Sequence, residues 1–89
     1  MILGRVKGQV VATIKHEAYA NRRLLMLDRI DPQGNDLGGY LVAIDTVGAR
    51  DGQIVLVIDE GNSARQIVDS STAPIRSVII GIVDEVQIA

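Results

Sequence analysis

The stretch I-L-G-R-V-K-G-Q-V-V-A-T-I, residues 2–14, alternates apolar or small residues with mostly polar ones. A period of two places successive side chains on opposite faces of an extended chain, so this stretch predicts a long strand with one buried face. Gly4 and Gly8 fall on the buried face, where a missing side chain permits strong coiling or close approach of another backbone. The opening of the chain therefore indicates a tightly curved β-sheet.

The composition favours the same structure along the whole chain. The 89 residues include 11 Val, 12 Ile and 7 Leu, whereas Phe, Trp and Cys are absent. Side chains branched at Cβ lose rotamer freedom in a helix and pack well on a pleated surface. A chain of this length forms one compact domain, residues 1–89, and 47% hydrophobic residues is a large share for so small an interior. We therefore expect a mostly β domain that associates with copies of itself.

Four more strands are expected after the first, separated by polar turns. Their ranges are 24–30, 39–45, 53–59 and 76–88, the last interrupted at Gly81. Ser63, with Gln66 three residues later, has the spacing of a capping box and predicts one short helix. Closure removes the exposed edges that such an apolar sheet could not safely leave open. The sequence thus predicts a five-stranded, OB-like closed barrel with one short helix.

Charge and residue types exclude several functions. The formal charge is −2 and the only aromatic residues are two Tyr, so we expect no binding to nucleic acid or to an anionic membrane. The first thirteen residues carry polar groups throughout, unlike a signal peptide or a membrane span, and we expect a cytoplasmic protein. His16, the single His, lies in a polar stretch and is interpreted as a surface residue. We expect no enzyme activity, no metal and no cofactor, because neither a catalytic nor a ligand spacing is present.

Three stretches resemble the EutN/CcmL family of microcompartment shell proteins. The opening Leu3–Thr13 is similar to the start of the family, and Asp45–Ala49 (D-T-V-G-A) to its D-x-V-G-A loop. Gly61–Arg65 (G-N-S-A-R) resembles its G-S-S-A-R signature, and the closing strand follows from Pro74 to Asp84. The chain departs from the family pattern at Asn62 and at Arg76. The order and spacing of the matches, over nearly the whole chain, identify it as a member of this family.

The resemblance implies a structural role. It implies a cyclic homopentamer that caps the vertices of a bacterial microcompartment, next to hexameric shell proteins and inside the cytoplasm. The alternative it leaves open is a pentameric pore that conducts small metabolites across the shell. The residues it assigns to subunit contacts or to the axial opening are Asp45, Thr46, Val47, Gly48 and Ala49, and Gly61, Asn62, Ser63, Ala64 and Arg65. Ordinary turn chemistry, with Gly48 and Gly61 at positive φ, is the other interpretation of both stretches.

Overall fold

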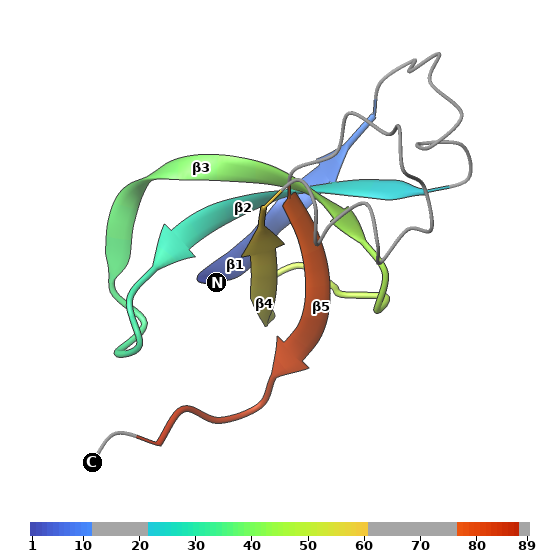
Figure 1. The fold of residues 1–89 in the computed structure, drawn as a ribbon. Helices are drawn as coiled ribbons and strands as arrows, with labels where there is room; N and C mark the ends of the chain where they lie inside the picture. The colour runs from blue at the N-terminus through green and yellow to red at the C-terminus, as the bar shows by residue number, and fades with distance from the viewer. Residues whose placement is uncertain (12–21, 61–76, 88–89) are drawn as a thin grey trace.

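A computed structural model describes residues 1–11, 22–60 and 77–87. These residues form five strands in chain order (Figure 1). The strands are β1 (Ile2–Val10), β2 (Arg23–Ile30), β3 (Asp36–Asp45), β4 (Ile54–Asp59) and β5 (Ser77–Val83). The described segments contain no helix, and the short helix predicted from Ser63 and Gln66 lies outside them.

The five strands close into a barrel in the order β1-β2-β3-β5-β4, with β4 pairing back onto β1. Every neighbouring pair is antiparallel except β3 and β5, which meet in parallel over only two residue pairs, Ile44 with Val78 and Asp45 with Ile79. The OB-like closed barrel predicted from the sequence is therefore confirmed.

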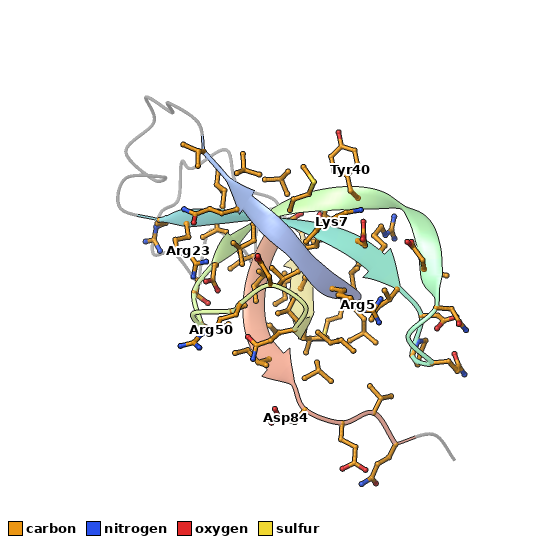
Figure 2. All side chains as sticks on the ribbon, turned by 180° about the vertical axis from the view of Figure 1, so that it is seen from behind. Arg5, Lys7, Arg23, Tyr40, Arg50 and Asp84 are labelled. Atoms are coloured by element: carbon orange, nitrogen blue, oxygen red, sulfur yellow. The ribbon has the colours of Figure 1, made fainter. Side chains whose placement is uncertain are left out.

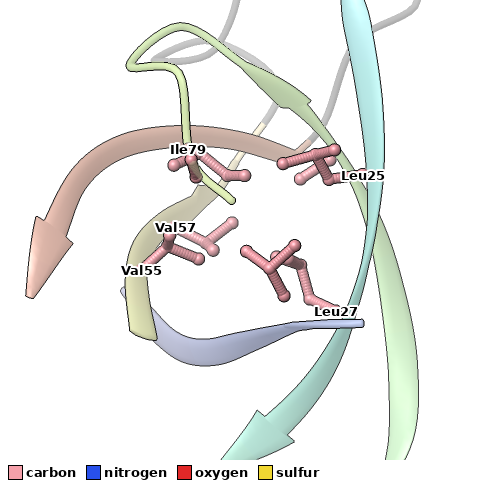
Figure 3. Packing of buried hydrophobic residues seen from close by; sticks show 8 residues of the cluster. Leu25, Leu27, Val55, Val57 and Ile79 are labelled. Atoms are coloured by element: carbon pink, nitrogen blue, oxygen red, sulfur yellow. The ribbon is translucent and has the colours of Figure 1, made fainter. Parts of the chain in front are cut away.

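The core fills the barrel with aliphatic side chains from all five strands and from one loop. Figure 3 shows Leu25 and Leu27 of β2 pointing across the interior toward Val55 and Val57 of β4. The full buried cluster is Val6, Leu25, Leu27, Ala43, Ala49, Val55, Val57 and Ile79. No polar or charged residue of the described part belongs to this buried core, although the side chain of Asp45 at its edge is only 2% exposed. Each fully buried Val, Leu or Ile contributes about 1.5–3 kcal/mol.

The two glycines of β1 serve the barrel differently. A Cβ on Gly4 would stand 3.1 Å from Cβ of Leu27, so the predicted close approach of another strand is confirmed there. A Cβ on Gly8 would meet nothing within 4 Å, so the predicted close approach of another backbone is wrong for Gly8. Between Val6 and Gly8 two steps of β1 match one step of β2, which marks a bulge. Gly8 thus lies at a point where the strand bends, since bulges increase local twist.

Three predicted strand limits are wrong, each because of the partner strand. β1 ends at Val10, which pairs with Leu24 near the start of β2; residues 12–14 lie outside the described part. β3 begins at Asp36, not Gly39, because it contains two residues more than β2 where Gly38 and Gly39 take φ of 77° and 76°. β5 ends at Val83, opposite Ile54, the first residue of β4. In the described part of the chain, residues 84–87 pair with no strand, and Ile88 lies outside that part.

Candidate functional site

Asp45, the last residue of β3, organises the loop that follows it. Its Oδ1 accepts hydrogen bonds from the backbone N–H groups of Val47 at 3.0 Å and Gly48 at 3.1 Å. Its Oδ2 accepts a third from the N–H of Ala49 at 3.1 Å. The side chain is 2% exposed. A single carboxylate therefore holds the shape of residues 45–49, called the Asp45 loop below, as Asp does in turns through bonds to its own backbone.

Arg23 closes the same arrangement from the neighbouring strand. It lies directly opposite Asp45 in the β2–β3 register, and its Nη1 is 3.2 Å from Oδ2 of Asp45. The same nitrogen donates to the carbonyl oxygen of Ala49 at 3.4 Å. Its side chain is 45% exposed, so we assign this ion pair the modest energy of a surface pair. Its geometric effect is to fix both ends of the loop to β2.

The other members of the Asp45 loop divide between an inner and an outer face. Ala49 is completely buried in the core and Val47 packs against it. Thr46 and Gly48 are exposed, and Gly48 has a φ of 76°, a conformation that residues with a side chain rarely adopt. The hydroxyl of Thr46 also donates to the carbonyl oxygen of Ile79 at 2.6 Å. That bond continues the short contact between β3 and β5 by one residue.

The chain beyond the loop is fixed to β1. The N–H of Arg50 donates to Oε1 of Gln53 at 2.8 Å, which closes the turn that leads into β4. The N–H of Gly52 donates to the carbonyl oxygen of Val6 at 2.8 Å, and the N–H of Val6 donates to that of Gln53 at 2.9 Å. The Asp45 loop therefore lies between β3 and a turn that hydrogen bonds hold to β1.

Sequence reasoning found five of these residues and missed two. Asp45, Thr46, Val47, Gly48 and Ala49 form one continuous structure, as the motif indicates. Arg23 and Gln53 were not singled out, because their roles depend on strand register and turn closure. The remaining candidates, Gly61, Asn62, Ser63, Ala64 and Arg65, lie outside the described residues.

Within the described ranges, no three His, Cys, Asp or Glu side chains gather as metal ligands. The described part also has no helix of the length and hydropathy that a membrane crossing requires.

The model of one protein family, "Ethanolamine utilisation protein EutN/carboxysome", matches residues 1–84. The chain belongs to the EutN/CcmL family. It is 50% identical over 86 residues to the microcompartment shell vertex protein EutN of Escherichia coli K12, covering 97% of this chain and 90% of the relative. It is 40% identical to the carboxysome shell vertex protein CcmL of Gloeobacter violaceus over 88 residues, which cover 99% and 87% of the two chains.

Solved structures of family members share the whole barrel. An EutN structure matches with a TM-score of 0.88 at 49% identity, over 98% of this chain and 90% of that one. The pentameric microcompartment shell protein GrpN of Rhodospirillum rubrum matches over the full length of both chains, with a TM-score of 0.86 at 40% identity. The family predicted from the sequence is confirmed. This EutN/CcmL chain is a structural protein of the microcompartment shell, located there within the cytoplasm, and not an enzyme.

Proposed function

We propose that this chain assembles into a cyclic homopentamer that occupies a vertex of a bacterial microcompartment shell, in contact with hexameric shell proteins. The observation that carries the proposal is the end-to-end match, at 40% identity, to a protein described as a pentameric shell protein. A closed shell of hexagonal units needs pentagonal units where it curves, and only closed fivefold rotational symmetry supplies one. The function is then geometric, and it requires no chemistry of its own.

We assign the outer face of the Asp45 loop to the contacts between copies or around the fivefold axis. Thr46 and Gly48 are exposed there, while the carboxylate of Asp45 is used entirely within its own chain. Asp45 would act indirectly, by holding the backbone that carries the exposed residues. The stretch Gly61–Arg65 is assigned to the same contacts on the strength of the sequence signature.

Native mass measurement at micromolar concentration tests the proposal. We expect a species of five chains, and co-assembly with hexameric shell proteins into closed shells visible by electron microscopy. A protein that is mainly monomeric or dimeric would contradict the vertex role, because no smaller cyclic species has pentagonal symmetry.

Arg65 gives a residue-level test of the second stretch. The guanidinium offers five donors in a rigid fork that suits carboxylates and carbonyl oxygens at an interface. We expect Arg65→Ala to weaken the pentamer or the closure of shells and to leave the β-rich circular dichroism spectrum unchanged. Lys7→Ala is the control, since Lys7 is 63% exposed and its pair with Asp28 at 3.4 Å lies within one chain. Equal assembly of the Arg65 variant and the parent would remove Arg65 from the interface.

A further inference from the structure

The residues after β5 form an arm that leaves the barrel. Figure 1 shows this segment, Asp84–Gln87, extending away from the end of β5 below the hairpin that joins β2 to β3. All four residues are exposed, and their side chains form no hydrogen bond or ion pair with any other residue of the described part. Figure 2 shows Asp84 where the arm begins. Val86 is apolar and 39% exposed. Removing its apolar surface from water is favourable, so the arm is suited to packing on another surface.

A groove of about 270 Å³ lies at the start of β1 and the end of β2. Its apolar lining comes from Met1, Ile2, Leu3, Ile30, Pro32 and Leu37. Met1 and Leu37 are 83% and 60% exposed, so the groove leaves apolar surface uncovered. None of the arm's residues lines the groove. Within the described residues, the arm of a chain therefore does not fill the groove of that same chain.

The charges of the groove and of the arm are complementary. Arg29 contributes to the lining, and its guanidinium forms no ion pair or hydrogen bond with the described residues. Asp31 also lines the groove, but its carboxylate already accepts the N–H groups of Gln33 and Asn35 at 2.9 and 2.8 Å. The arm has two carboxylates, at Asp84 and Glu85, immediately before Val86. A free cation beside apolar walls thus matches an acidic pair followed by an apolar side chain.

We propose that the arm of one copy docks in this groove, the Leu37 groove, of the adjacent copy in the ring. In an extended segment residues two apart share a face, so Val86 enters the apolar part while Asp84 faces the guanidinium of Arg29. Four extended residues span at most about 14 Å, enough to cross a contact between neighbouring barrels. Each copy in a closed ring gives one arm and receives one, so all grooves are filled once. This inference rests on the proposed homopentamer and adds a defined contact to it.

A cysteine pair tests the contact directly, because the chain has no Cys of its own. A disulfide requires Cβ atoms about 3.5–4.5 Å apart, so it reports on contact rather than on mere proximity. After mild oxidation of the Leu37→Cys, Val86→Cys double variant, we expect a ladder from dimer to pentamer on a denaturing, non-reducing gel. The control pairs Val86→Cys with Val42→Cys, since Val42 is exposed on β3 but does not line the groove. It should remain monomeric on the gel.

Native mass of the parent separates the two possible failures. If the parent is pentameric but its Leu37→Cys, Val86→Cys variant gives only monomer on the gel, with or without an internal disulfide, the arm contact is overturned. The vertex proposal then remains intact. A parent that is not pentameric overturns both.

Charge reversal provides an independent measurement on the same contact. Arg29→Glu and Asp84→Lys should each weaken the ring, by about two- to fivefold for each contact, which is typical of losing an exposed ion pair. The double variant should regain the parent's dissociation midpoint, measured by dilution in a mass-based assay. Lys7→Glu is the control, because Lys7 is 63% exposed and does not line the groove. Singles that dissociate like the parent, or a double variant that is not rescued, contradict the assignment of Asp84 and Arg29 as partners.

Discussion

Replacing Asp45 by Ala should lower the free energy of unfolding of the subunit more than any other single substitution in the Asp45 loop. The carboxylate satisfies three backbone N–H donors, those of Val47, Gly48 and Ala49, from a position that is 2% exposed. A hydrogen bond contributes about 1 kcal/mol net, so three give about 3 kcal/mol. The partly exposed pair with Arg23 adds about 0.2–1 kcal/mol. We expect a loss of about 3–4 kcal/mol in the free energy of unfolding.

Urea unfolding followed by circular dichroism measures this loss. Parent and variant are compared at one protomer concentration, because association itself adds apparent stability. For a domain of this size a loss of 3 kcal/mol corresponds to a fall in Tm of about 12–24 °C. Asp51→Ala is the matched control, since Asp51 is exposed and its side chain has no partner in the described part of the chain. It should stay within about 0.5 kcal/mol of the parent. If the Asp45 variant also stays within that margin, the loop is not held by its carboxylate.

Three smaller perturbations test other parts of the barrel. Hydrogen bonds from the backbone of Asn35 lower the pKa of Asp31 below its ordinary value of 3.8 in the folded protein. Its contribution to stability is therefore full above about pH 3.8 and is lost as the pH falls through the lowered pKa, so Asp31→Asn should flatten that part of the unfolding profile between pH 5 and 2. Gly4→Ala should cost about 1–3 kcal/mol in urea unfolding, because the new methyl group would meet Leu27 at 3.1 Å, whereas Gly8→Ala, with open space around it, should cost much less. Gly48→Ala should cost about 1–2 kcal/mol in the same assay, because its φ of 76° is strained for any residue with a Cβ.

The strand count and the closed barrel could be predicted because they depend on local patterns. Alternation along residues 2–14 predicts the curved β1, and branched aliphatic residues leave few alternatives to strands elsewhere. Strand ends could not be predicted, since each ends where its partner ends. β5 stops at Val83 although apolar residues continue to alternate beyond it, because Val83 pairs with the first residue of β4.

The partner of Asp45 could not be predicted for a related reason. Near the turn Ile30 pairs with Asp36, and an uninterrupted ladder from that pair would set Arg23 opposite Ala43. The two additional residues of β3, where Gly38 and Gly39 take positive φ, shift the register so that Arg23 lies opposite Asp45. The glycine pair at the start of the strand predicted over 39–45 was the available signal, because glycine within a strand often marks a bulge. The number of additional residues in β3, two, could not be predicted from the sequence pattern alone.

The two interpretations of the Asp45 loop, turn chemistry and subunit contact, describe different faces of one structure. Its inward residues account for most of the D-T-V-G-A motif: Asp45 accepts hydrogen bonds from three N–H groups, Val47 packs on the core, and Ala49 is completely buried in it. Those requirements are met within a single chain. They leave only Thr46 and Gly48 facing outward, and Gly48 exposes bare backbone. A partner would therefore meet a surface of fixed shape with almost no side chain of its own. Such a surface selects its neighbour by fit, so changes in Asp45 and changes in the outer residues should differ in effect. Changes in Asp45 should act mainly on subunit stability, whereas changes in Thr46 or Gly48 should lower assembly by more than their own cost in subunit stability explains.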